Sequence, residues 1–299
     1  MTEGGPTERV RRYGTGLLST EVYADGTGGY LWRRAPGPSA RTPFTPVPAG
    51  LAAAIGALSQ DGPGCCVLGR EENRTRVYRV GGEASVAERA LREGPGRGLG
   101  ETLYAVGALL GRFHALPEHH AADSGLPVGS AGMHRLTSWW SGRTTNGRSA
   151  TAAELLRAEL GADNWRLAQR WLAGALADTR SMVVSHGAPT LGSVIHTGPD
   201  DEVHLLTGEN LCLAPWYADL GWLVGELVEL AWHHGDDHAQ WQAALDALFE
   251  GYGRDLGAHW NRAAAVRIAL HLHDYSAYVA LNPLEIRRYA SFLSHLITL

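Results

Sequence analysis

The chain has 299 residues, which is enough to bury a sizeable hydrophobic core in one two-lobed domain or in two smaller ones. Hydrophobic residues make up 44% of the sequence and charged residues 19%, which excludes a disordered chain. The formal net charge of -5 gives no reason to expect nucleic acid as a partner.

The sequence pattern predicts neither a membrane segment nor a secretion signal. No apolar run approaches the ~20 residues that a membrane-spanning helix needs. Residues 1–12 are polar and lack the apolar centre of a signal peptide. Among the three cysteines, Cys65 and Cys66 are adjacent and make a poor disulfide framework. We therefore expect a cytoplasmic location and no membrane partner.

Every cationic side chain other than histidine is arginine, because the chain contains no lysine. The abundance of arginine, alanine and glycine indicates a GC-rich bacterial coding sequence, which could deplete lysine by itself. A lysine essential for activity should survive such a drift, so its absence bears on function.

The chain begins with a predicted flexible arm over residues 1–12. Three short strands should follow, separated by glycine turns, of which the first contains Gly14 and Gly16. The third strand ends on Arg33 and Arg34. These strands begin a small β-rich unit.

A proline-rich connection at residues 36–48 leads to a predicted short helix at 49–58 that contains no acidic residue. Residues 65–69 and 75–80 have strand composition, and we expect them to pair as a hairpin. Residues 81–83 resemble a hinge between two lobes, and we place the boundary between two parts of the chain near them.

The second part is mainly helical. Apolar residues recur at helical spacing through residues 102–116, and His114 is interpreted as a packed histidine at the helix end. Residues 136–149 resemble a loop, and 151–160 and 165–176 are predicted helices. Three more helices are expected at residues 237–256, 261–279 and 283–296.

The predicted loop contains two adjacent tryptophans, Trp139 and Trp140, followed by Arg143 and Arg148. Exposed tryptophans favour interfaces, so this pair could line a ligand or peptide site. Aromatic packing between the two parts of the chain is the alternative.

Residues 182–229 contain the most informative pattern. An apolar run leads into His186 and Gly187, and two short strands at 194–195 and 203–206 flank a polar turn. From Asp219 onward, leucine and valine recur at the spacing of a buried helix face.

This order of loop, hairpin and buried helix resembles the catalytic core of the aminoglycoside phosphotransferase and choline kinase family. The helix ending at residues 110–117 is also similar to the family's Leu-Gly-x-Leu-His-x-Leu-Pro ending. The resemblance implies an α+β, two-lobed, protein-kinase-like fold. After the arm, the N-lobe would span residues 13–82 and the helical C-lobe 83–299, with a degenerate catalytic loop at 185–209.

The spacing matches the family's His-Gly-Asp, four residues, Asn-Val and its Asp-x-Glu, but several functional residues differ. Ala188 stands where the family has the base aspartate, Ser193 where it has asparagine, and Thr207 where it has the metal aspartate. His186, Glu209 and Asp219 are retained. Arg33 or Arg34 stands near the position of the family's strand lysine.

Phosphoryl transfer depends mainly on positioning and on charge neutralisation by a metal ion. Alanine cannot accept a proton from a hydroxyl nucleophile, and Mg²⁺ prefers carboxylates to hydroxyls. We therefore expect no cofactor and no bound metal. The first hypothesis is a pseudokinase that acts as a binding or scaffold subunit, in which Asp219 anchors the loop through hydrogen bonds.

The rival hypothesis is an active phosphotransferase that uses Mg-ATP with atypical residues. Glu209 and Asp219 would then bind metal, and His186 or the substrate itself would move the proton. Phosphates would contact the turn at Gly14 and Gly16 together with an arginine of the third strand.

A protein or peptide partner is expected. Phosphotransferase-like proteins of bacterial natural-product pathways can work beside a lyase-like partner to dehydrate Ser and Thr in a precursor peptide. By that analogy, Trp139 and Trp140 would line the acceptor groove, and Arg143 and Arg148 would meet acidic groups of a peptide.

We expect no metal site at the histidine-aspartate cluster near residue 235. His234 and His238 are spaced four apart beside Asp236 and Asp237, but Gly235 interrupts the segment where one helix ends and another begins.

Overall fold

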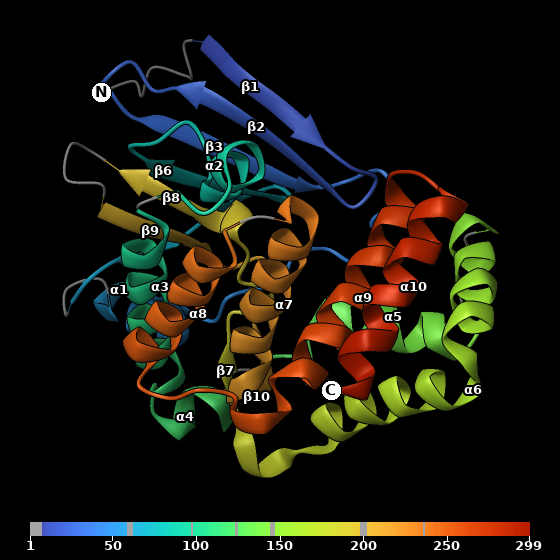
Figure 1. The fold of residues 1–299 in the computed structure, drawn as a ribbon. Helices are drawn as coiled ribbons and strands as arrows, with labels where there is room; N and C mark the ends of the chain where they lie inside the picture. The colour runs from blue at the N-terminus through green and yellow to red at the C-terminus, as the bar shows by residue number, and fades with distance from the viewer. Residues whose placement is uncertain are drawn as a thin grey trace.

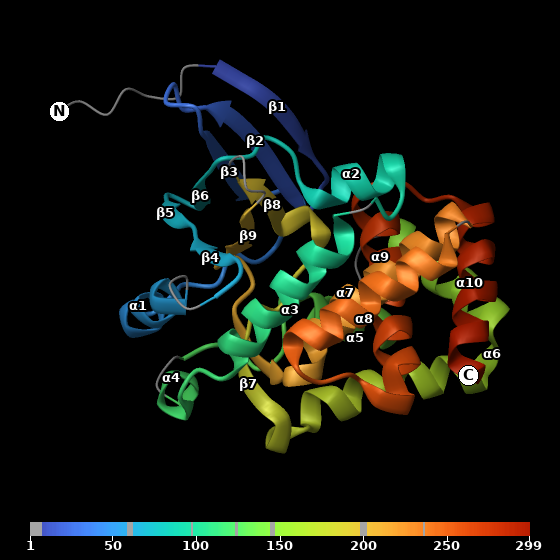
Figure 2. The ribbon, with the colours of Figure 1, turned by 60° about the vertical axis from the view of Figure 1, so that its left-hand side comes forward.

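The computed structural model describes residues 8–58, 62–96, 98–122, 125–143, 147–197, 202–235 and 237–299. Figures 1 and 2 show an N-terminal sheet beside a larger body of helices. The two-lobed α+β fold predicted from the sequence is confirmed. Within the described ranges no helix is both long and apolar enough to cross a membrane.

The N-lobe contains a five-stranded antiparallel sheet in the order β1-β2-β3-β6-β5. Its strands are β1 (Glu8–Gly14), β2 (Leu18–Ala24), β3 (Tyr30–Pro36), β5 (Arg70–Glu72) and β6 (Thr75–Val80). One helix, α1 (Ala49–Ala57), follows β3 as predicted.

The predicted flexible arm at residues 1–12 is wrong for residues 8–12, which belong to β1, and residues 1–7 lie outside the described residues. The strand pairs with β2 along its length. Its Arg11 side chain also donates hydrogen bonds to Glu88 at 2.8 Å and to Glu83 at 3.1 Å. These contacts attach the edge of the sheet to residues 83–88, which follow β6.

The predicted hairpin between residues 65–69 and 75–80 is also wrong. Strand β6 pairs instead with β5, across a tight turn in which Asn73 has a φ of 51°. Strand β4 (Cys65–Leu68) pairs in parallel with β9 (Glu202–Thr207), which in turn pairs with β8 (Val194–Thr197). Because β6 pairs with β5, its nearest neighbour in the sequence, β4 is free to pair with β9 and extend the β8–β9 hairpin.

The C-lobe is built mainly from helices. They are α2 (Val86–Glu93), α3 (Leu99–His114), α4 (Glu118–Ala122), α5 (Ala131–Trp140), α6 (Gly147–Ala177), α7 (Trp216–His234), α8 (His238–Tyr252), α9 (Trp260–Tyr278) and α10 (Pro283–Thr298). A two-stranded antiparallel ribbon of β7 (Met182–Ser185) and β10 (Cys212–Pro215) carries the loop that resembles the catalytic loop.

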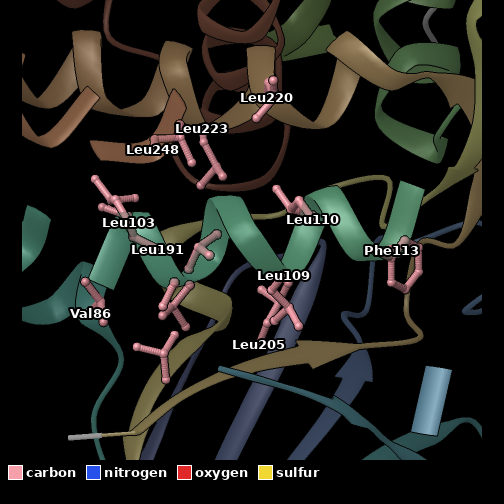
Figure 3. Close-up of a cluster of buried hydrophobic side chains, with 14 of the residues drawn as sticks. Val86, Leu103, Leu109, Leu110, Phe113, Leu191, Leu205, Leu220, Leu223 and Leu248 are labelled. Carbon is pink, nitrogen blue, oxygen red and sulfur yellow. The ribbon is translucent and has the colours of Figure 1, made fainter. Parts of the chain in front are cut away.

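Helix α3 lies at the centre of the larger hydrophobic core. Figure 3 shows Leu223 and Leu248 on one side of it and Leu205 on the other. Gly107 permits direct backbone contact with α8, since a Cβ there would lie 2.2 Å from the carbonyl oxygen of Leu248. This packing fixes the helix on which His114 is carried.

A second core joins α5, α6, α9 and α10. Helix α6 breaks at Gly161, where φ is 76°, which accounts for the two helices predicted on either side of it. Residues 136–140 are not a loop as predicted but the end of α5. That helix begins at the cap Ser130, whose hydroxyl accepts a hydrogen bond from the Met133 N–H.

Candidate functional site

Asp219 anchors the loop that follows β7. One carboxylate oxygen accepts the His186 N–H at 2.7 Å, and the other accepts the Gly187 N–H at 2.9 Å. Burial opposes the ionisation of Asp219, but its contact with His114 and these backbone hydrogen bonds hold its pKa below the ordinary value. Both oxygens of Asp219 are therefore occupied by the protein, as expected for an anchor.

His186 is buried and does not line the cleft between the described parts of the two lobes. Burial lowers the pKa of His186, so the ring is neutral and its Nε2–H donates to the Leu206 carbonyl at 2.9 Å. Thr207 is equally enclosed, and its hydroxyl donates to the Leu205 carbonyl at 3.0 Å. Neither residue is placed to contact a substrate.

Arg34 lies at the centre of the interlobe contact. It extends from β3 and donates to the Ser193 hydroxyl at 3.0 Å and to the Glu209 carboxylate at 3.3 Å. A third hydrogen bond reaches the Gly192 carbonyl. Burial disfavours the charge of Arg34, but the Glu209 carboxylate raises its pKa above the ordinary value. The guanidinium remains charged although only 4% of the residue is exposed.

Glu209 has a second internal partner, because the Tyr78 hydroxyl donates to it at 2.8 Å. Burial and the nearby carboxylate raise the pKa of Tyr78 well above its ordinary value, so the hydroxyl stays protonated. Sequence analysis did not identify Tyr78. It shares a face of β6 with Arg76 and Val80, a pattern that gives no sign of a functional role.

The residues present do not fit a magnesium ion. Ser193 and Thr207 replace the family's metal-binding amide and carboxylate, and Glu209 is already paired with a fixed cation. Across the described ranges, no three His, Cys, Asp or Glu side chains come together in a manner that could hold a metal. Asp236 of the rejected histidine-aspartate cluster lies outside those ranges.

The space between the N-lobe sheet and the β8–β9 hairpin is filled with side chains. Trp32 lies there, fully buried, and its indole N–H donates to the Gly82 carbonyl at 2.8 Å. The other buried members of this cluster are Val22, Tyr78, Val80, Ile195 and Leu206, none more than 4% exposed. A flat aromatic ligand would have to displace Trp32 to enter.

The turn between β1 and β2 has little capacity left for a phosphate group. Thr15 N–H donates to the Leu18 carbonyl at 2.7 Å, and the N–H groups of Leu17 and Leu18 donate to the Thr15 hydroxyl. Gly16 N–H donates across the lobes to the Tyr278 carbonyl at 3.1 Å. Each N–H from residue 15 to 18 therefore has an internal acceptor.

Gly14 and Gly16 are explained by this close packing. A Cβ at Gly14 would lie 2.7 Å from the Leu18 carbonyl oxygen, and one at Gly16 would lie 3.0 Å from the Ser39 hydroxyl. Arg33, the neighbour of Arg34, points to the other face of the sheet. Its side chain is 40% exposed and meets Glu72 at 3.8 Å.

A cleft of about 1890 Å³ lies beside this closed region, between β1, the proline-rich connection, α5 and the end of α9. Ala188, Ser193 and Glu209 line it. Its charged lining residues are Arg11, Arg12, Arg34, Arg41, Arg135, Arg143, Glu88, Glu209 and Asp274. The cleft therefore carries six arginines against three carboxylates, although the whole chain has a net charge of -5.

The four residues predicted to line an acceptor groove separate in the structure. Arg143 and Trp139 line the cleft, but Trp139 is only 1% exposed and its indole N–H donates to the Ser149 carbonyl. Trp140 is 6% exposed and packs against Trp165. Arg148 donates instead to the carbonyls of Ala277 and Val279. The tryptophans thus belong to the core, and an exposed tryptophan pair was the wrong expectation.

Sequence analysis missed the polar pair on the far wall of the cleft. Arg135 on α5 and Asp274 on α9 form two hydrogen bonds, at 3.0 and 2.6 Å. The Arg135 charge helps to hold the pKa of Asp274 below its ordinary value, against the effect of burial. No local pattern joins residues so far apart in sequence.

No protein-family model matches the sequence, and no curated protein matches it. Solved structures do match. A spectinomycin phosphotransferase, solved with ADP and spectinomycin, has a TM-score of 0.55 and 12% identity over 97% of this chain and 92% of that one. The chain has the fold of phosphotransferases.

Two other structures agree. An aminoglycoside phosphotransferase from Streptomyces rimosus has a TM-score of 0.52 and 22% identity, covering 92% of this chain and 94% of that one. A choline/ethanolamine kinase family protein from Mesorhizobium loti has a TM-score of 0.51 and 16% identity, covering 99% and 88%. The fold inferred from the loop, hairpin and helix pattern is therefore confirmed.

Proposed function

We propose that the chain is a pseudokinase, a binding subunit that keeps the phosphotransferase fold without transferring phosphoryl groups. The observation that carries this proposal is the position of Arg34. Its guanidinium lies between Ser193, which stands at the position of the family's metal-binding asparagine, and Glu209, the carboxylate that an active enzyme would have to use for metal. A fixed internal cation thus neutralises the carboxylate that a magnesium ion would need.

The surroundings of Arg34 support the same proposal. Ala188 offers no group that could accept a proton from a hydroxyl. The N–H groups of the turn at residues 15–18 are used internally, and Trp32 fills the space beside the segment that joins the lobes. Binding of a nucleotide would require breaking several of these contacts together.

The ligand of such a subunit would lie in the open cleft, and we propose an acidic peptide. The excess of arginine over carboxylate in the cleft favours an anion over the cationic acceptors of other phosphotransferases. The cleft volume of about 1890 Å³ leaves room for several residues of a peptide. A role beside a lyase-like partner that dehydrates Ser and Thr in a precursor peptide is part of this proposal, by analogy alone.

Thermal unfolding of the purified protein with ATP, in the presence and absence of Mg²⁺, tests the absence of nucleotide binding. A ligand at 100 times its Kd stabilises a fold by about 2.7 kcal/mol, which a melting curve detects easily. We expect no shift at millimolar ATP, with an active phosphotransferase of the same fold as the positive control. A clear Mg²⁺-dependent rise in Tm would favour the active enzyme instead.

A further inference from the structure

A second pocket lies between α6, α7 and α9, on the C-lobe side of the loop at residues 186–193. We call it the α6–α7–α9 pocket. Its volume of about 500 Å³ is within the range of small-molecule sites. Trp222 lines both this pocket and the interlobe cleft, so the two are neighbours that share one wall.

The walls of the pocket are largely aromatic. Trp171, Trp216, Tyr217 and Trp222 line it, and each is only partly buried. The buried side chains Met133, Leu136, Leu172 and Leu270 contribute the remaining apolar surface. Partly exposed aromatic rings beside such a surface are suited to a flat apolar group.

Three arginines line the pocket. Arg170 and Arg262 line it, and neither forms an ion pair with a carboxylate of the described residues. Arg262 lies over the Trp171 ring, 5.7 Å from its centroid. The third arginine, Arg267, is partly neutralised by Glu229 at 3.7 Å.

The pocket offers little negative charge to oppose these arginines. Its only carboxylate among the described lining residues, Asp219, accepts hydrogen bonds from the backbone of His186 and Gly187. Helix α7 begins at the pocket with Trp216, and the first N–H groups of a helix have no acceptor within it. Asp219 lies in that first turn and offsets its positive end, so the positive charge available to a ligand comes from Arg170 and Arg262.

We propose that the α6–α7–α9 pocket binds a small aromatic carboxylate. The ring would lie against Trp171 and Trp222, and the carboxylate would meet Arg170 and Arg262. A neutral aromatic molecule would gain the apolar contacts alone, and a cation would be repelled. This site is distinct from the closed nucleotide region, although its Trp222 wall also borders the interlobe cleft.

The test is calorimetric titration of the full chain with 1-naphthoate and with 1-naphthalenemethanol, its neutral analogue. We expect saturable binding of naphthoate with a Kd of about 1 mM or lower, as is reasonable for a ligand of this size. The neutral analogue should bind about tenfold more weakly, because a charge-assisted hydrogen bond contributes about that factor.

Two variants localise the binding. Arg170→Gln with Arg262→Gln should weaken naphthoate binding about tenfold. The matched control, Arg157→Gln with Arg287→Gln, changes two exposed arginines outside the pocket and should leave affinity unchanged. Gly174→Phe, at a lining position where an added Cβ has nothing within 4 Å, should reduce binding by filling space.

The proposal is overturned by any of three results. These are no saturable binding of naphthoate, equal affinity for the neutral analogue, or unchanged affinity in the Arg170→Gln, Arg262→Gln variant. Circular dichroism of each variant verifies that the fold is native.

Discussion

The interlobe region has a closed side, around Arg34 and Trp32, and an open side, the cleft. On the closed side, the polar groups form hydrogen bonds with one another to a greater extent than on the open side. On the closed side, Arg34, Glu209 and Tyr78 are paired with one another and the turn at residues 15–18 uses its own N–H groups. On the open side, a cleft of about 1890 Å³ carries an excess of arginine. Internal contacts thus close one side of the interlobe region, while the other side stays accessible.

The largest effect is expected where the open side borders the core. Replacing both Trp139 and Trp140 with alanine removes two buried indoles, each worth about 3–5 kcal/mol. The double variant should be largely unfolded, as measured by circular dichroism and urea titration. A native spectrum with lost peptide binding would instead show that the tryptophans form a ligand-contact surface.

Arg34→Ala should be almost as damaging, because it leaves Glu209 buried without its cation. Breaking a buried ion pair on one side costs about 3–5 kcal/mol. The matched control is Arg33→Ala, on the same strand but with a side chain 40% exposed, for which we expect less than about 1 kcal/mol. If both variants lowered the free energy of unfolding equally, the Arg34–Glu209 ion pair would not stabilise the contact between the lobes.

Asp219→Asn sharpens the distinction between an anchor and a metal ligand. An amide cannot accept with both of its atoms, so one N–H of His186 or Gly187 would lose its partner. Stability should fall by about 1–3 kcal/mol while any residual affinity for nucleotide stays unchanged. Normal stability together with lost Mg²⁺ binding would assign Asp219 to metal instead.

Asp219 should also make the free energy of unfolding fall in acid. Its folded pKa lies below the ordinary value, so the native state binds fewer protons than the unfolded state in acid. The stabilisation is complete above the unfolded pKa of about 3.9 and is lost as pH falls through the folded pKa. Urea titrations between about pH 2 and 5 should show a steeper acid loss for the wild type than for Asp219→Asn.

The smallest effect concerns the charge of the cleft. Reversing Arg143 to glutamate should weaken binding of an acidic probe such as hexaglutamate only several-fold, because exposed charges are screened. The control, Arg157→Glu, adds the same charge on α6 outside the cleft lining. Fluorescence anisotropy of the labelled probe at low and high salt measures the affinity of both variants. Equal losses of affinity would show that the probe binds outside the cleft.

Sequence reasoning identified the fold because short motifs with fixed spacing carry it. His186, Gly187 and Asp219 stand where the family has them, and the structure brings them together through backbone hydrogen bonds. The choice between Arg33 and Arg34 was also within reach. Side chains alternate along a strand, so the residue two positions from buried Trp32 points to the same face.

Other features could not be read locally. The parallel pairing of β4 with β9 joins residues more than a hundred positions apart, and nothing in either strand specifies its partner. Trp139 was assigned to a loop although Met133, Leu136 and Trp140 repeat at helical spacing, and the cap Ser130 marked the start of that helix. The sequence therefore contained enough information to predict this helix.

Isothermal titration of Mg-ATP into the wild-type protein tests most directly whether the closed side excludes nucleotide. With Arg34 paired to Glu209 and Trp32 bonded to Gly82, we expect no saturable heat at millimolar concentrations. A saturable, Mg²⁺-dependent isotherm with a submillimolar Kd would contradict the account.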